Sequence, residues 1–295
     1  MSLDTTKSLP DSSNLAKPPA EPRLLYSNPD FLVFDKPQGV SFYEDGNKHD
    51  LLKAVRKMQE DGRIPDGDRL FPVHRLDKVT SGLLLFARGR ANANHLGNEF
   101  RFNRVNKIYI ALSLHPPKKR HGFVEGDIVK SRRGSYKLSR DSHATTRTFY
   151  TSRSIPNRRP GLRLFLVKPE TGKTHQIRVV LKSIGSPILG DWLYDRFDTA
   201  RIEERTYLHA AAISFQLKGK THRFVELPGD GAEYLSSDFK DTLTSFGDLF
   251  KVDWPAATPN HHSIHASFSD HSQHQKQSKA KNNRPGRRER RSRKP

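Results

Sequence analysis

The chain has 295 residues and a net charge of +20, from 52 Lys and Arg against 32 Asp and Glu. Its isoelectric point near 10.2 indicates a polyanionic partner, of which nucleic acid is the simplest. The sequence contains no Cys, which excludes disulfides, thiolate nucleophiles and Cys-ligated zinc.

The first 20 residues are polar and rich in Pro and Ser, and we expect residues 1–20 to form a disordered leader. They lack the apolar core of a signal peptide, and no segment elsewhere approaches the roughly eighteen apolar residues of a membrane span. We therefore expect a cytoplasmic protein that binds no membrane, with one folded domain over residues 21–258.

The beginning of this domain reads as a hairpin followed by a helix. Apolar runs at Arg23–Tyr26 and Phe31–Phe34 flank a turn-forming segment, which predicts the hairpin. Residues 51–61 have apolar side chains at helical spacing behind Asp50, the predicted N-cap. The next two elements are predicted from their apolar patterns: a buried strand over Gly82–Arg88, and a helix over 90–101 with a weak apolar stripe of Ala91, Leu96 and Phe100.

A charged turn precedes the buried strand and is the first candidate functional segment. It reads His74-Arg75-Leu76-Asp77 and continues to Thr80. Arg75 flanks Asp77, and nearby cations keep a carboxylate ionised even when it is partly desolvated. Asp77 is therefore a candidate nucleophile or base. The alternative, equally consistent with spacing alone, is that its side chain caps a turn or a helix.

Residues 106–112 alternate in a pattern that predicts a strand. Lys107, Tyr109 and Ala111 would share one face, with three aliphatic residues on the other. By base rates Tyr109 alone would be an ordinary half-buried strand aromatic. Further strands are predicted over 123–129, 144–151 and 162–168, and the basic loops between them are either solvated edges or RNA contacts.

A second candidate segment runs from Thr171 to Gly185. Gly172-Lys173-Thr174 is not a phosphate loop, because Val167 stands where the motif requires glycine. Thr174 is the predicted N-cap of a helix that ends before Gly185. Its basic residues His175, Arg178 and Lys182 would lie along one stripe that faces either an acidic partner or solvent. Strands over Ile213–Leu217 and Arg223–Leu227, and a helix over 233–246, would complete the domain.

These segments resemble the RluA family of RNA pseudouridine synthases over roughly residues 23–228. The resemblance rests on His74–Asp77 with Thr80–Leu84, on Asp35–Val40, on the Lys-x-Tyr-x-Ala-Leu strand, and on Gly172–Val179, with further similarity at Pro187–Tyr194 and Tyr207–Ala210. It implies an α+β fold, in which a largely antiparallel, bent mixed sheet with flanking helices encloses a central active-site cleft. Three residues depart from the family pattern: Lys173, Val180 and Ser186.

The resemblance also implies roles for individual residues. Asp77 would be the catalytic nucleophile or base, Tyr109 the active-site tyrosine, and Arg178 the partner of Asp77. The residues expected to bind substrate are His74, Arg75, Thr80, His175, Gln176 and Leu208. The implied reaction isomerises specific uridines of rRNA or tRNA to pseudouridine, requires no metal or cofactor, and is expected of a monomer whose partner is RNA.

Two other functions fit the same cleft: a non-catalytic RNA-binding or ribosome-assembly protein, and a glycosylase that releases uracil. The composition changes after residue 258, because residues 259–295 hold ten Lys and Arg against two acidic residues. We expect them to form a disordered basic tail. Such a tail either contacts RNA phosphates or only aids solubility, and the first is favoured.

Overall fold

One mixed sheet runs through the residues that this computed structural model describes, which are 21–42, 50–65, 69–139, 145–195, 200 and 202–256. The expected leader and tail, residues 1–20 and 259–295, lie outside the described residues. The strand order is β1-β2-β4-β10-β5-β9-β8-β6-β7, with β3 beside β4 and β11 beside β10. Among these described strands only β4 and β10 pair in parallel, so the expected α+β fold with a largely antiparallel sheet is confirmed.

The elements have the following bounds. The strands are β1 (Arg23–Ser27), β2 (Phe31–Lys36), β3 (Leu70–Pro72), β4 (Ser81–Arg88), β5 (Asn106–Ser113), β6 (His121–Lys130), β7 (Tyr136–Ser139), β8 (Thr146–Ser154), β9 (Arg163–Pro169), β10 (Leu208–Leu217) and β11 (Lys220–Val225). The helices are α1 (Leu51–Glu60), α2 (Gly89–Arg101), α3 (Gln176–Ser183), α5 (Ala232–Leu235) and α6 (Ser237–Thr244), with 3₁₀ turns at Arg132–Gly134 and Leu249–Lys251.

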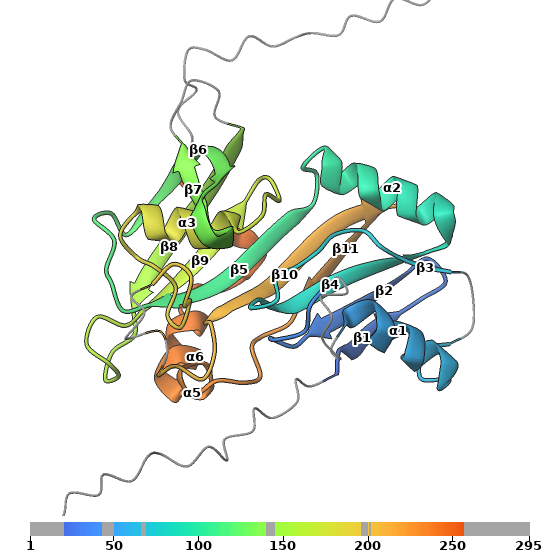
Figure 1. Cartoon of the computed structure of the whole chain (residues 1–295), viewed down its shortest axis with the longest axis horizontal. Helices are drawn as coiled ribbons and strands as arrows, with labels where there is room; N and C mark the ends of the chain where they lie inside the picture. Colours follow the sequence, from blue (N-terminus) through green and yellow to red (C-terminus); the bar gives the residue numbers. More distant parts are fainter. Residues whose placement is uncertain are drawn as a thin grey trace, which may run out of the picture. The chain divides into compact units, whose positions relative to one another are not determined.

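The first half of the sheet consists of β1, β2, β3 and β4. It is built around β4, which is buried over its whole length. Alternate side chains point to opposite faces, so Leu84 packs in the cluster of α1 while Leu83 packs in that of α2. Helices α1 and α2 lie along this half (Figure 1). The Asp50 side chain accepts a hydrogen bond from the Leu52 amide, 2.8 Å away, which confirms the predicted N-cap.

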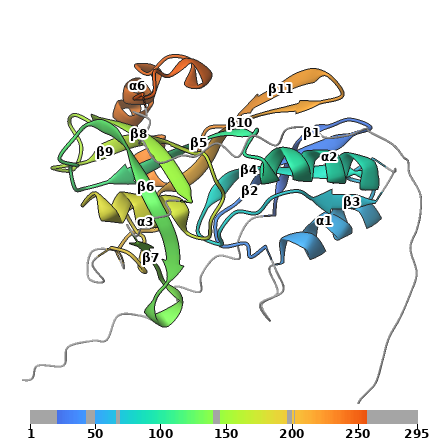
Figure 2. The same cartoon turned by 90° about the horizontal axis from the view of Figure 1, so that it is seen from above.

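The second half of the sheet is covered on both faces (Figure 2). Ile108 and Ile110 of β5 share a cluster with residues of α5 and α6, whereas Ala111 shares one with α3. The predicted alternation along β5 is therefore confirmed. Its two faces belong to two separate cores, and Tyr109 stands on the face that carries α3.

The two halves meet where β4 runs parallel to β10, with Ser81 opposite His209 and Gly82 opposite Ala210. Gly82 has φ +110°, and a Cβ there would lie 2.4 Å from the Ala210 carbonyl oxygen, so only glycine fits. Further along β10 a register shift between Ala210 and Ala212 marks a bulge against β5. Bulges bend a sheet, and this one lies beside the junction.

A buried hydrogen-bond network fixes the same junction. The Arg205 guanidinium donates to Ser81 Oγ at 2.6 Å, and that hydroxyl in turn donates to His209 Nδ1 at 2.9 Å. His209 Nε2 donates to the Glu226 carbonyl at 2.9 Å. Burial lowers the pKa of His209 to about 3, so its ring is neutral here. The start of β4, four residues after Asp77, is thereby tied to a distant part of the chain.

Several sequence expectations need correction. The N-cap of α3 is His175 in the left-handed conformation, not Thr174, because the Gln176 side chain accepts from the Lys173 amide and closes the preceding turn. The predicted helix over 233–246 is broken at Ser236, whose backbone is extended and whose hydroxyl caps α6. In addition, β10 begins at Leu208 rather than at Ile213, β7 was not predicted, and Ala91 is exposed rather than part of the α2 stripe.

Candidate active site

Lys36 helps to hold the turn that carries Asp77. This lysine at the end of β2 is fully buried, and its ammonium donates to the carbonyl oxygens of Pro37 and Val40 at 2.9 and 3.0 Å. Burial lowers the pKa of Lys36 to about 7, although the charge of Asp77 works in the opposite direction. The Lys36 ammonium and the Gly39 amide also reach the Lys78 carbonyl oxygen, at 3.5 and 2.8 Å, and the turn is thus held directly after Asp77.

Arg178 brings α3 to this turn. Its Nη1 lies 3.4 Å from Asp77 Oδ2, while Nε and Nη2 donate to the two carboxylate oxygens of Asp191 at 2.7 and 2.8 Å. Desolvation opposes the charge of Arg178, but the bidentate contact with Asp191, aided by Asp77, raises its pKa. Arg178 is therefore a fixed cation, and the carboxylate of Asp77, with 18% of its side chain exposed, faces it from the pocket side.

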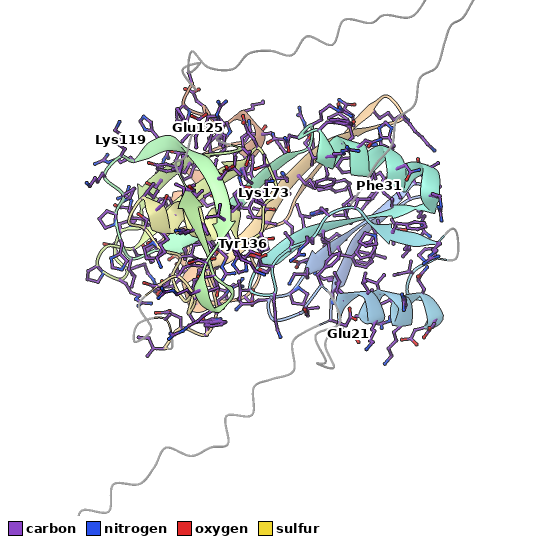
Figure 3. All side chains as sticks on the ribbon, turned by 45° about the horizontal axis from the view of Figure 1, so that its top comes forward. Glu21, Phe31, Lys119, Glu125, Tyr136 and Lys173 are labelled. Atoms are coloured by element: carbon purple, nitrogen blue, oxygen red, sulfur yellow. The ribbon has the colours of Figure 1, made fainter. Side chains whose placement is uncertain are left out.

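His175 also lies close to Asp77 and is itself in contact with two tyrosines. His175 Nε2 lies 3.9 Å from Asp77 Oδ2, and His175 Nδ1 makes a 2.8 Å hydrogen bond with the Tyr194 hydroxyl. The Tyr136 ring meets His175 edge to face with centroids 5.2 Å apart. Tyr136, which is labelled in Figure 3, is the first residue of β7, the last strand in the sheet order. Burial and Arg178 lower the pKa of His175 despite the nearby carboxylates.

A cavity of about 600 Å³ opens above these groups. All nine predicted site residues line it: His74, Arg75, Asp77, Thr80, Tyr109, His175, Gln176, Arg178 and Leu208. They come from the Asp77 turn, β5, the start of α3 and β10. Lys173, which is labelled in Figure 3, also lines the cavity, as do Arg101 and Lys107, and the lining is accordingly rich in cations.

Tyr109 and Leu208 form the apolar wall of the cavity. Tyr109 packs against clusters of both halves of the sheet, and Leu208 lies 2% exposed in the cluster of α3. Burial, and then the negative charge of Asp77, raise the pKa of Tyr109. The phenol is therefore protonated at neutral pH and presents an aromatic face with a hydroxyl that can donate.

Two of the predicted substrate-binding residues already use their polar atoms within the protein. His74 Nε2 accepts from the Leu85 amide at 3.0 Å, and its ring stacks on Phe100 with centroids 4.5 Å apart. Burial lowers the pKa of His74 to about 3. The amide group of Gln176 joins Thr171 to Thr148 through hydrogen bonds of 2.7 and 2.9 Å. Both side chains shape the cavity wall.

The sequence reasoning assigned no role to several residues that build this site. Asp191, with 0% exposure, holds Arg178, and Tyr194 lies 4.9 Å beneath its guanidinium. Lys107 donates to the Thr171 carbonyl at 3.1 Å, and burial lowers its pKa to about 8. Asp191 lies in the Pro187–Tyr194 segment that shares the family resemblance, but an acidic residue between glycine and tryptophan, in a segment with no periodicity, gives no indication of its direction.

Within the described residues, no group of three His, Asp or Glu side chains is arranged to hold a metal ion. None of the described helices is long and apolar enough to cross a membrane.

Comparison with known proteins places this chain in a family. Residues 30–183 match the family model described as RNA pseudouridylate synthase. An uncharacterized RNA pseudouridine synthase of Haemophilus influenzae is 41% identical over 213 residues, which are 72% of this chain and 89% of the relative. The ribosomal large subunit pseudouridine synthase D of Borreliella burgdorferi is 30% identical, over 74% of this chain and 68% of its own length.

Two further comparisons concern a relative that this chain spans only in part and a solved structure of low sequence identity. The ribosomal large subunit pseudouridine synthase C of Vibrio vulnificus is 31% identical over 70% of this chain, which spans 63% of that relative. The solved structure of human RNA pseudouridylate synthase domain containing 4 superposes with a TM-score of 0.60 at 23% identity, covering 74% of this chain and 93% of that one. At this identity the superposition shows a common fold.

The protein is therefore an enzyme, an RNA pseudouridine synthase. Within that class it belongs to the RluA family, as the sequence motifs indicated.

Proposed function

We propose that this enzyme isomerises uridines of large-subunit ribosomal RNA, with Asp77 as the reacting carboxylate. The observation that carries the proposal is the pair between Asp77 and Arg178 in the wall of a nucleoside-sized cavity. Two of the relatives described above are named as large-subunit ribosomal RNA enzymes, which supports this choice of RNA. A ribosomal substrate would place the enzyme in the cytoplasm.

The reaction exchanges one bond of the base for another. The N1–C1′ bond breaks, the uracil turns while enclosed, C5 bonds to C1′, and the C5 proton leaves while N1 gains one. Asp77 either attacks C1′ or abstracts the 2′ proton to give a glycal, and both routes require an ionised carboxylate. Arg178 serves that requirement, because a fixed cation 3.4 Å away stabilises the charge of Asp77.

The remaining residues would hold the flipped nucleotide. A uridine inside a duplex is not accessible, so its base must leave the stack and enter the cavity. We propose that it lies against the Tyr109 ring, since RNA bases stack on aromatic side chains. Arg75, at the cavity entrance, would occupy the space left behind, and Lys173 would contact phosphate. The raised pKa of Tyr109 favours stacking and hydrogen-bond donation over removal of the C5 proton.

One chain supplies every group in this mechanism, which supports action as a monomer. The test is to map pseudouridine across total RNA from cells with and without the gene. We expect a uridine of large-subunit rRNA to lose its modification and to regain it with the wild-type gene, but not with Asp77→Asn. Restoration by Asp77→Asn would contradict the assignment of Asp77, and loss confined to tRNA would contradict the choice of RNA.

A further inference from the structure

An exposed aromatic side chain stands beside the catalytic cavity at the end of α2. Phe102 is 56% exposed, although phenylalanine normally lies buried. The guanidinium of Arg104 lies 5.0 Å from its ring centroid and that of Arg101 lies 5.7 Å away. An aromatic ring flanked by two planar cations is the kind of surface on which single-stranded bases stack.

The position of Phe102 is fixed by the backbone around it. Its amide donates to the Asn98 carbonyl at 2.9 Å, and Asn103 follows in the left-handed conformation with φ 57°. The Arg104 side chain is tied to the nearly buried carboxylate of Glu99 by hydrogen bonds of 2.8 and 2.6 Å. The backbone that carries the ring and one of the cations beside it are therefore held in place before any RNA arrives, which limits the ordering that stacking requires.

The neighbours of Phe102 line two adjoining cavities. Arg101 lines the catalytic cavity, Arg104 lines a second polar cavity of about 600 Å³, and Asn103 lines both. The two cavities also share Thr145, Pro169 and Thr171. The nucleotides that flank a uridine in the first cavity are covalently attached to it and must leave by the rim of that cavity, of which this shared border is one part.

We propose that Phe102 is a stacking platform for the base next to the target uridine. The inference rests on the proposed function, since it assumes that the catalytic cavity holds the uridine. Phe102 contributes to capture and to the choice of single-stranded surroundings, and it contributes nothing to bond breaking. Stacking accepts any base, so the platform selects an unpaired neighbour rather than a particular sequence.

The test measures binding of a fluorescein-labelled oligoribonucleotide that spans the mapped uridine, in the Asp77→Asn background. Phe102→Ala should raise Kd by roughly 5- to 100-fold, the range found when base–aromatic stacking is removed. Phe102→Tyr should bind within about twofold of the parent, because one aromatic ring replaces another. Leu235→Ala is the matched control: this residue is 50% exposed on α5, lines neither cavity and should leave Kd unchanged.

Oligoribonucleotides with an abasic site on the 5′ or the 3′ side of the uridine identify the stacked base. On one side the abasic site should weaken the parent by the same factor as Phe102→Ala, and the substitution should then cost nothing more. Equal Kd values for Phe102→Ala and the parent on intact RNA would overturn the proposal. So would a loss that persists undiminished with both abasic oligoribonucleotides.

Conversion by the wild-type enzyme is measured separately on the intact oligoribonucleotide. Its absence would count against the proposed function, while the binding comparison would still decide the role of Phe102. With Phe102→Ala, the single-turnover rate at saturating enzyme should equal that of wild type. A lower saturated rate would place Phe102 in the chemical step and would also overturn the proposal.

Discussion

The floor and the rim of the cavity that Asp77 lines differ in burial. On the floor, Arg178 is 3% exposed and held by three charged contacts, and Asp191 beneath it is fully buried. On the rim, all four residues from Arg101 to Arg104 are exposed. Burial makes the geometry of the floor costly to alter, whereas the rim faces solvent and salt. We therefore expect floor substitutions to change rate and stability, and rim or tail substitutions to change RNA capture.

The largest effect is expected at Asp77. Asp77→Asn preserves size and hydrogen bonding but removes the charge, so turnover should fall on the order of 10⁴-fold or more, as for other nucleophile removals. RNA affinity and the unfolding midpoint should remain near wild type. Single-turnover conversion of the mapped oligoribonucleotide measures the loss of turnover. Substantial residual turnover would contradict the role of Asp77.

The second-largest effect is expected at Asp191, although this residue does not line the cavity. Asp191→Ala leaves Arg178 charged and buried without its principal partner, which should cost about 3–5 kcal/mol of unfolding free energy. The displaced guanidinium should also lower turnover by roughly 10²-fold, as small misplacements do.

The double variant Asp191→Ala, Arg178→Met separates these two effects. It removes the unpaired charge, so it should recover stability relative to Asp191→Ala alone while turnover stays low. Denaturant unfolding and single-turnover rates measure the two. If Arg178→Met alone retained the wild-type rate, the pairing with Asp77 would have no catalytic role.

The junction beneath the floor should show a pH dependence. The pKa of His209 is about 3 in the folded protein and about 6.5 in the unfolded chain, so between these values the unfolded state binds more protons. The unfolding free energy should therefore fall as pH drops from about 6.5 towards 3, by on the order of 5 kcal/mol in full.

His209→Asn should flatten this pH dependence, because asparagine does not titrate there. The exposed His115→Asn is the control and should leave it unchanged. Denaturant unfolding at a series of pH values measures the slopes. An unaltered slope in His209→Asn would show that other groups dominate acid unfolding.

Tyr109 sharpens the distinction between stacking and proton transfer. Tyr109→Phe keeps the ring, so we expect the single-turnover rate to fall by no more than about tenfold, the worth of one hydrogen bond. A loss of roughly 10²–10⁴-fold would instead indicate proton transfer by the hydroxyl. Tyr109→Ala also removes the ring. Its single-turnover rate and its RNA affinity should both be lower than those of Tyr109→Phe.

The smallest effect is expected from the tail. Deleting residues 259–295 removes a net charge of +8, so binding should weaken at low salt and log affinity should depend less steeply on log salt. The saturated rate should not change. A full-length chain with the ten basic tail residues replaced by Gln is the matched control and should behave like the deletion. Modification of a different uridine by the truncated enzyme would make the tail a specificity element.

Local elements of the fold were predictable from the sequence. The Asp50 cap, the apolar run of β4 and the alternation in β5 each depend on residues within one segment. Thr174 failed as a cap because the Gln176 side chain accepts from the Lys173 amide in the same turn, and Gln176 is itself oriented by Thr148 of β8, which no local rule includes. The broken helix at Ser236 illustrates the same limit, since cap and interior positions were both compatible with serine.

The candidate site required information that spacing does not contain. Asp77 and Arg178 are 101 residues apart, and only the family resemblance suggested that they meet. Asp191 escaped prediction because its partner lies across a turn, and because a carboxylate in an irregular segment has no preferred face. Phe102 is visible in the sequence, but its exposure and its two guanidinium neighbours are properties of the folded chain.

The parallel pairing of β4 with β10 also sets when the enzyme becomes competent during its synthesis. Ser81 and His209 are 128 residues apart, so β4 emerges long before its partner exists. At ordinary elongation rates the delay is on the order of ten seconds. Until then the Asp77 turn lacks the junction that holds it, and Arg205 and Leu208 are missing. A nascent chain that stops before residue 208 should therefore remain catalytically silent, however much RNA its basic segments attract.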